Sequence, residues 1–314
     1  MRHYVFILPA LLALLMSCRS TDNSMETPEE LIPVRFSIQF SKELLPFPGT
    51  RAMPSCPITE PTRSKSDDQE EPGSDKEIQD FCTTIEYIVY KDNIVTTPVR
   101  QIQYTSDDDD FGTIYDELPA GSYQIVLLAH SSLELTQTEG VLTFNEVSDT
   151  FCHLEEIDIE TGMEINEFIT LRRAVGGIEF MSSSAVPDNI KSVTLEIAGY
   201  PNSYKPIADE GMQKTTATTL TFPIKAEDAG KEEMSHIIFA FIPPNEGALS
   251  ITFKAIDNEE NLLREFTIEE IKPIKNKIIR YTGNLYYGTL PGETLTLSIY
   301  DNGEWDEIIE EPIE

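Results

Sequence analysis

The chain is dominated by short segments in which apolar and polar residues alternate, the period expected of a half-buried β-strand. In the first of them, residues 34–40 (VRFSIQF), every second side chain is apolar. Similar segments recur roughly every ten residues and are separated by Gly, Pro and Asn, a pattern typical of an antiparallel β-sandwich. The others are residues 83–90, 94–104, 123–129, 168–172, 174–180, 192–198, 218–222, 237–242, 249–256, 262–268, 275–285 and 295–300.

One turn between these segments has a clear local cause. In Leu118–Tyr123 (LPAGSY), Pro119 fixes φ at one position and Gly121 allows a positive φ at another, and the apolar run 123–129 follows at once. Amphipathic helices are scarce, since residues 149–159 and 268–275 would form one or two turns at most. We therefore expect an all-β protein.

The strand pattern restarts after Glu160-Thr161-Gly162, which indicates two domains. A usual domain size of about 100–200 residues is consistent with two domains in this chain. We expect an N-terminal β-sandwich at 34–161 and a C-terminal β-sandwich at 162–314 that ends in an acidic tail. The stretch 46–80 is rich in Pro, Ser, Asp and Glu, and is expected to be a long exposed loop or a partly disordered insertion.

The N-terminus has the order of a bacterial lipoprotein signal. Arg2 and His3 precede an apolar run at 4–16, and Ser17 stands directly before Cys18. The run is too short for a mature membrane-spanning helix, which needs about 20 residues. We expect residues 1–17 to be removed, Cys18 to be acylated, and residues 18–33 to form a flexible tether. The alternative is a dispensable signal with an incidental cysteine.

The charge excludes one class of partner. The sequence has 55 acidic and 23 basic residues, which gives a formal net charge of −32. Such a field repels nucleic acid and bare anionic membrane surfaces. The negative charge does not identify a partner, because acidic side chains also serve simply to keep a protein surface solvated.

Three cysteines remain once Cys18 is set apart: Cys56, Cys82 and Cys152. In an exported protein one disulfide can form, and the pair Cys82–Cys152 is favoured because both flank strand-like sequence. Two buried free thiols in neighbouring strands are the alternative. No spacing of Cys and His residues indicates a zinc site.

Little in the sequence indicates catalysis. The run Asp107–Asp110 resembles a calcium ligand set only in composition, because it lacks the spaced ligands and Gly of an EF-hand, so a solvated loop is favoured. The histidines His130, His153 and His236 are scattered, and no Ser, Cys or Thr lies in a nucleophile-elbow motif. We expect no enzyme, no metal and no cofactor.

Two further features bear on binding and assembly. Tyr286-Tyr287 and Tyr200 with Tyr204 would stack on sugars if exposed, although tyrosines at strand ends more often pack in a core. In residues 295–300 apolar and polar side chains alternate, as expected of a terminal strand. This segment would either complete its own domain or pair with a neighbouring subunit.

Several motifs together carry a family resemblance. Besides Cys18 and the VRFSIQF strand, they are the LPAGSY turn, LRRAVGGIEF at the start of the second domain, IAGYPNSY, FAFIPP and NKIIRYTGNLY. In this order the chain resembles the Bacteroidales fimbrillin superfamily, most of all its branch of lipoprotein fimbrial anchors and minor subunits (type V pilus-like). The resemblance extends from about Cys18 to Trp305.

The resemblance implies a fold, a mode of assembly and a processing site. The fold would be two tandem transthyretin-like, Greek-key β-sandwiches, and subunits would assemble by donation of a strand into a neighbour's sheet. A trypsin-like protease would release the first strand of stalk subunits by cutting after an arginine, and Arg51 stands where that cut would fall. Anchor-type members keep this strand, in which case Arg51 is an ordinary loop residue.

Two functional hypotheses follow. The first is a non-enzymatic lipoprotein of the outer membrane, held by Cys18 at the cell surface, that anchors a fimbria or forms a minor or tip subunit. The second is a surface lipoprotein that binds glycans or other ligands on similar β-sandwiches. Neither involves nucleic acid.

Overall fold

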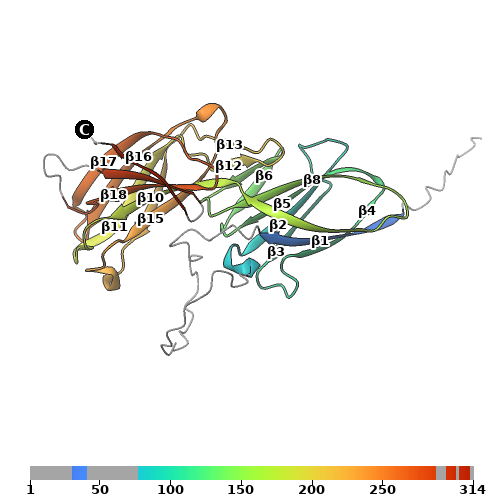
Figure 1. Cartoon of the computed structure of the whole chain (residues 1–314), viewed down its shortest axis with the longest axis horizontal. Helices are drawn as coiled ribbons and strands as arrows, with labels where there is room; N and C mark the ends of the chain where they lie inside the picture. The colour runs from blue at the N-terminus through green and yellow to red at the C-terminus, as the bar shows by residue number, and fades with distance from the viewer. Residues whose placement is uncertain (1–29, 41–76, 288–294, 302–303, 312–314) are drawn as a thin grey trace, which may run out of the picture.

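The computed structural model describes residues 30–40, 77–287, 295–301 and 304–311. In these ranges the protein is built from β-strands and three single 3₁₀ turns, with no α-helix (Figure 1). None of these described parts contains a helix long and apolar enough to cross a membrane. The 3₁₀ turns are η1 (Ile78–Asp80), η2 (Ala226–Asp228) and η3 (Pro244–Glu246). The expected all-β class is confirmed.

The molecule is elongated, with an N-terminal lobe and a C-terminal lobe side by side along its long axis (Figure 1). The N-terminal lobe is a seven-stranded sheet in the order β3-β2-β5-β8-β9-β1-β4. β8 and β9 pair only at Phe151↔Arg173 and Cys152↔Arg172, so the sheet divides there into two layers. The strands are β1 (Leu31–Phe40), β2 (Thr84–Lys91), β3 (Arg100–Thr105), β4 (Thr113–Pro119), β5 (Gly121–His130), β8 (Phe151–Ile159) and β9 (Ile165–Arg173).

The C-terminal lobe is a sandwich of two sheets. One has the order β15-β10-β18-β19-β20 and the other β14-β11-β16-β17. Their apolar faces meet in a core that includes the stacked rings of Phe253 and Phe266, whose centroids are 4.8 Å apart. The strands are β10 (Val175–Ser182), β11 (Ile190–Ala198), β14 (Thr218–Pro223), β15 (Ser235–Phe241), β16 (Leu249–Asp257), β17 (Leu262–Ile271), β18 (Lys277–Gly283), β19 (Leu295–Asp301) and β20 (Glu304–Glu311).

A small fourth sheet joins the lobes. It has the order β13-β12-β7-β6, with β6 (Leu135–Thr138) and β7 (Val141–Phe144) from the N-terminal part and β12 (Ser203–Lys205) and β13 (Glu210–Met212) from the C-terminal part. The β6–β7 hairpin turns at Glu139 (φ 51°) and Gly140 (φ 77°), both in the left-handed region that two-residue hairpin turns use. A Cβ on Gly140 would lie 2.3 Å from the carbonyl oxygen of Val95, so only glycine fits this turn.

The central strands of the N-terminal sheet are buried on both faces. In β2, Ile85, Tyr87 and Val89 belong to the core of the N-terminal lobe, whereas Ile88 and Tyr90 belong to the cluster that extends through the C-terminal lobe. β5 divides its side chains in the same way. The two lobes therefore share one continuous apolar core at their junction, which we call the shared core.

A buried ion pair lies beside the shared core. Arg173 donates from Nε and Nη2 to the two carboxylate oxygens of Asp149, at 2.7 and 2.8 Å, and from Nη1 to Oδ1 of Asn276 at 2.7 Å. Its guanidinium also stands over the ring of Phe151, 4.9 Å from the centroid. Burial raises the pKa of Asp149, and the hydrogen bonds and charge of Arg173 oppose that rise. Arg173 thus joins β9 and the loop before β8 to the C-terminal segment that precedes β18.

The structure corrects four sequence expectations. Residues 151–159 form the strand β8 and no helical turn, because β5 pairs along their whole length. β1 begins at Leu31, inside the expected tether. The sheets are mixed, since β1 pairs in parallel with β9 and β10 in parallel with β18. The first sheet also continues past Gly162 to Arg173, so the expected boundary falls one strand too early.

Breaking the Arg173 pair should destabilise the protein. Arg173→Met leaves the buried Asp149 carboxylate without its partner, and the loss of one member of a buried pair costs about 3–5 kcal/mol. The neighbouring Arg172 is exposed, so Arg172→Met serves as the matched control and should change little. Urea unfolding followed by circular dichroism measures both values, and equal losses in the two variants would contradict a stabilising role of the pair.

Candidate functional site

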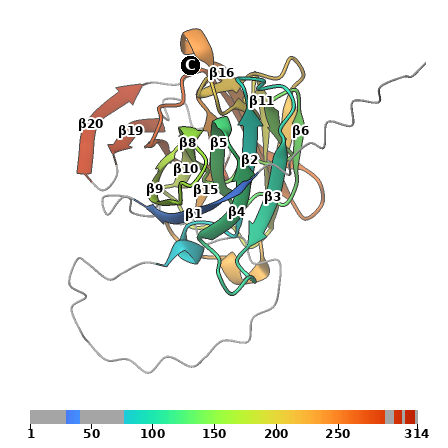
Figure 2. The ribbon, with the colours of Figure 1, turned by 90° about the vertical axis from the view of Figure 1, so that its right-hand side faces the viewer.

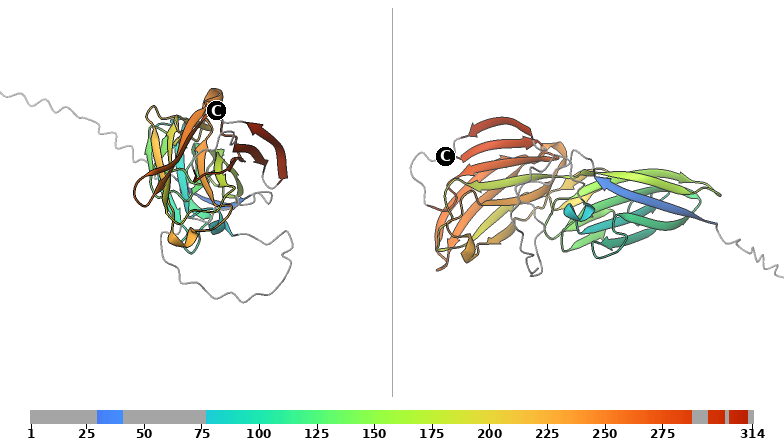
Figure 3. Two further views of the ribbon diagram at one scale, coloured as in Figure 1. Left: turned by 90° about the vertical axis from the view of Figure 1, so that its left-hand side faces the viewer. Right: turned by 60° about the horizontal axis from the view of Figure 1, so that its bottom comes forward.

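β1 occupies the middle of one layer of the N-terminal lobe. It pairs in parallel with β9, from Val34↔Ile165 to Phe40↔Leu171, and antiparallel with β4, from Leu31↔Pro119 to Ser37↔Thr113. Its inward side chains fill the core of the lobe and are each 6% exposed or less: Ile32, Val34, Phe36 and Ile38. Figure 3 (right) shows β1 running along the surface of the lobe as a strand of the sheet. Both of its ends lead into segments outside the described residues.

The C-terminal edge of the molecule is a hairpin. β19 pairs antiparallel with β18, from Lys277↔Asp301 to Thr282↔Thr296, and β20 pairs with β19. β20 is the outermost strand of its sheet (Figure 2). The interpretation of residues 295–300 as a strand of their own domain is therefore confirmed. In the described parts of the chain, one backbone edge of β20 has no strand partner.

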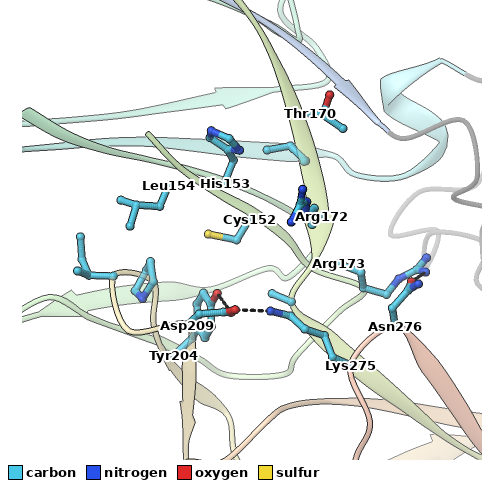
Figure 4. Close-up of a pocket in the computed structure, with 14 residues that line it drawn as sticks. Cys152, His153, Leu154, Thr170, Arg172, Arg173, Tyr204, Asp209, Lys275 and Asn276 are labelled. Carbon is cyan, nitrogen blue, oxygen red and sulfur yellow. Dashed lines mark hydrogen bonds and ion pairs between the residues drawn. The ribbon is translucent and has the colours of Figure 1, made fainter. Parts of the chain in front are cut away.

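A hollow of about 630 Å³ lies at the junction, beside the ends of β8 and β9. Figure 4 shows Cys152, His153 and Arg172 entering it from these strands and Lys275 from the opposite side. Lys275 Nζ donates to Asp209 Oδ2 at 2.5 Å, and the hydroxyl of Tyr204 donates to Asp209 Oδ1 at 2.7 Å. The residues that line the hollow are Cys152, His153, Leu154, Thr170, Leu171, Arg172, Arg173, Ala174, Tyr204, Pro206, Ile207, Asp209, Lys275 and Asn276.

The structure places the expected cysteine pair on opposite faces of one sheet. Cys82 packs in the core of the N-terminal lobe together with Phe151, whereas Cys152, the next residue along β8, points to the other face, toward the shared core. Both are free thiols, so the expected disulfide is wrong and the alternative of two separate thiols describes the structure. Burial raises the pKa of each to about 12, which keeps both protonated and poorly nucleophilic.

Two other expected site residues, Cys18 and Arg51, lie outside the described residues. The acylation of Cys18 and the processing at Arg51 therefore stay predictions.

The acidic run forms an exposed turn between β3 and β4. Asp108 accepts hydrogen bonds from the backbone N–H of Thr105 at 2.7 Å and from the Thr105 hydroxyl at 3.2 Å, so its carboxylate stabilises the turn itself. Within the described parts of the chain, no group of three or more His, Cys, Asp or Glu side chains is arranged to hold a metal ion.

Three of the four tyrosines considered for sugar stacking are buried. The Tyr200 hydroxyl donates to the carbonyl of Phe239 at 2.8 Å. Tyr204 stacks on Phe241 with centroids 4.6 Å apart, and Tyr286 is wholly buried. Only Tyr287 is exposed. These four residues therefore form no aromatic platform, and the packing interpretation is confirmed for three of them.

The histidines take structural positions. His130 is buried, and its Nδ1 accepts a hydrogen bond from the backbone N–H of Ser132 at 3.1 Å, while its Nε2 stands 3.8 Å from Glu86. His153 pairs with Glu155 at 2.8 Å on the side of β8. His236 is buried in the C-terminal core, with Nε2 3.3 Å from the hydroxyl of Tyr286.

Comparison with known proteins gives distant structural neighbours. No protein-family model and no curated protein matches the chain. A crystal structure of a candidate adhesin from Bacteroides ovatus has a TM-score of 0.48 and 12% identity, over 84% of this chain and 94% of that chain. A fimbrial assembly protein from Parabacteroides distasonis has a TM-score of 0.47 and 9% identity, over 90% and 100% of the two chains. The fimbrial anchor protein Mfa2 from Porphyromonas gingivalis has a TM-score of 0.42 and 10% identity, over 90% and 100%.

The structural neighbours are thus adhesin-like and fimbrial proteins of Bacteroidales. At these identities and TM-scores, the similarity assigns no role to this chain.

His236 should make stability depend on pH. Burial lowers its pKa from 6.5 to about 4, so between these values the unfolded chain binds a proton that the folded chain does not. Its contribution to stability is fully present above about pH 6.5, declines as the pH falls, and is lost below about pH 4. The free energy of unfolding, measured by urea titration between pH 7 and 4, should fall less steeply in His236→Gln than in the wild type. A slope unchanged in His236→Gln would contradict the prediction.

Proposed function

We propose that this chain is a non-enzymatic lipoprotein that anchors a fimbria at the cell surface or forms a minor or tip subunit of it. Acyl chains on Cys18 would hold it in the outer membrane. Its partners would be fimbrial subunits, bound by β-strand complementation between the two transthyretin-like sandwiches and a neighbour. The sequence resemblance to fimbrial anchors and minor subunits supports this class of function.

The observation that carries the proposal is the position of β1. Four inward side chains of one strand complete the core of the N-terminal lobe, and burial of each is worth about 1.5–3 kcal/mol. A strand with both edges paired and one apolar face buried is the kind of element that subunits exchange in strand complementation. β1 is held in the sheet by its pairing with β4 and β9 and by this burial.

A mature protein that keeps β1 would act as an anchor and not as a stalk subunit. With β1 in place, the facing edges of β4 and β9 are already satisfied, so a strand from another subunit finds no groove in this layer. Such a subunit would end a fibre. Cleavage after Arg51 would separate β1 from the remaining chain and open the groove for a donor strand, as in the stalk subunits of the family.

The lipid anchor requires more than one acyl chain. A single chain binds a membrane only marginally, so lasting attachment requires two or more. The segment from Cys18 to Leu31 would connect these lipids to β1. Acidic residues just after the cysteine agree with export to the surface: Asp22, Glu26, Glu29 and Glu30.

The first test is a pull-down of the intact protein extracted from membranes. Mass spectrometry of its own N-terminus and of the co-purifying chains should find an acylated Cys18, an uncut Arg51 and fimbrillin-like subunits. Cleavage after Arg51 would favour a polymerising tip or shaft subunit over an anchor. An acylated, uncut protein accompanied only by components of glycan uptake would replace the fimbrial role by the ligand-binding alternative.

A second test addresses the anchor alone. Cys18→Ala removes the acylated residue, so the protein should move from the membrane fraction to the soluble fraction. Cys56→Ala is the control, because it also removes a thiol and should leave the protein in the membrane. Immunoblotting of both fractions measures where each variant lies. Retention of Cys18→Ala in the membrane fraction would contradict the lipoprotein assignment.

A further inference from the structure

The hollow at the junction is bounded by both lobes. One part of its wall comes from residues 152–154 and 170–174, and the other comes from residues between 204 and 209 and from 275–276 (Figure 4). Its volume of about 630 Å³ lies within the range of about 300–1,000 Å³ that is typical of small-molecule sites. A molecule held in the hollow would therefore contact both lobes at once.

Part of the wall is apolar surface that the fold leaves incompletely covered. Leu154 of β8 and Ile207, in the loop between β12 and β13, pack against the shared core and also line the hollow. Both are only partly buried. Ala174 and Pro206 add further apolar atoms to the wall. An apolar group placed in the hollow would remove this surface from water, which favours binding.

Asp209 is the only carboxylate among the described residues that line the hollow. Both of its oxygens already have partners, because Oδ1 accepts a hydrogen bond from the hydroxyl of Tyr204 and Oδ2 accepts one from Nζ of Lys275. The negative charge of Asp209 is therefore compensated within the wall, and Asp209 does not need a cation from a ligand.

Arg172 differs from the other charged groups of the wall. It is exposed near the end of β9, and among the described residues it has no carboxylate partner. Two carboxylates that do not line the hollow contact residues that do, and both are engaged: Asp149 pairs with Arg173, and Glu155 pairs with His153. The guanidinium of Arg172 is thus left to bind an anion from outside the described chain.

We propose that the hollow binds a small organic anion with an apolar body, such as a free aromatic or aliphatic carboxylic acid. Its carboxylate would pair with Arg172, because a guanidinium group donates two parallel, charge-assisted hydrogen bonds to a carboxylate. Its apolar body would cover Leu154 and Ile207. The combination of an apolar wall with a single available charged group is typical of sites that orient a small ligand.

Occupancy of the hollow would strengthen the junction. A ligand that binds only the folded protein raises the free energy of unfolding as its concentration rises above the dissociation constant. Since the wall includes residues of both lobes, the bound anion would add contacts across the junction. The proposed ligand therefore has a second measurable effect, a rise in the midpoint of thermal unfolding.

The test uses two matched fluorescent probes, anilinonaphthalene sulfonate and phenylnaphthylamine, which is the same fluorophore without the sulfonate. The sulfonate stands in for the carboxylate of the ligand. The parent protein is the chain from residue 18 onward with Cys18→Ala, so that no detergent is present to bind the probes. Fluorescence titration should show saturable binding of one sulfonate probe per chain and weaker binding of the neutral probe. The sulfonate should also raise the midpoint of thermal unfolding.

Two substitutions in the parent protein separate the charged and apolar contacts. Arg172→Gln should weaken binding of the sulfonate about tenfold, because it removes a hydrogen-bonded charge, and should leave binding of the neutral probe unchanged. Ile207→Ala should weaken binding of both probes about tenfold, because it removes apolar surface from the wall.

Each substitution has a matched control outside the hollow. Arg35→Gln removes an exposed arginine of β1, and Ile94→Ala removes an apolar side chain that is 59% exposed. Both controls should bind the two probes as the parent does. The proposal would be overturned if the parent did not bind the sulfonate, if it bound the two probes equally, or if Arg172→Gln kept the parent's affinity for the sulfonate.

This site goes beyond the fimbrial role and does not require it. Binding of the sulfonate by a protein that carries no fimbrial subunits would support the site and contradict the fimbrial assignment. The pull-down and the titration therefore fail separately.

Discussion

The whole structure depends on covering both faces of β2 and β5. The sequences of these two strands are almost continuously apolar. Either face of the strands would expose a large apolar area to water if no other element covered it. One face is covered by β1, β4 and β9 within the N-terminal lobe. The other is covered by the β6–β7 hairpin and the C-terminal lobe, which is why the two lobes share a core.

The junction adds specificity to this apolar contact. Phe144 of β7 and Tyr204 of β12 both lie against Phe241 of β15, with centroids 5.2 and 4.6 Å from its ring. The amide of Asn202 donates to the carbonyl of Phe144 at 2.5 Å, so the small sheet is tied across the lobes by side chain as well as backbone. The buried Arg173–Asp149 pair fixes the end of β9 at the same place. In the proposed anchor role, such a junction would resist hinge motion between the lobes.

β1 serves two surfaces at once because successive side chains of a strand point to opposite faces. Its inward residues complete the core, and its outward Arg35 stands over the ring of Tyr115 on β4. Any processing that released β1 would therefore change both surfaces together: it would open the core to a donor strand and remove the cation between Tyr115 and Asn166.

The sequence by itself determined the all-β class and most strand positions, because alternation and turn residues act over a few neighbouring positions. It also indicated that residues 295–300 complete their own domain, and that Tyr200, Tyr204 and Tyr286 pack inside. Other features depend on segments far apart in the chain. Only the tertiary structure showed that β9 belongs to the first sheet, that β1 and β10 have parallel partners, and that Cys82 and Cys152 face different cores. The proximity of Arg35, Tyr115 and Phe168 was equally hidden, because these residues meet only when three distant strands pair, and local sequence does not encode that register.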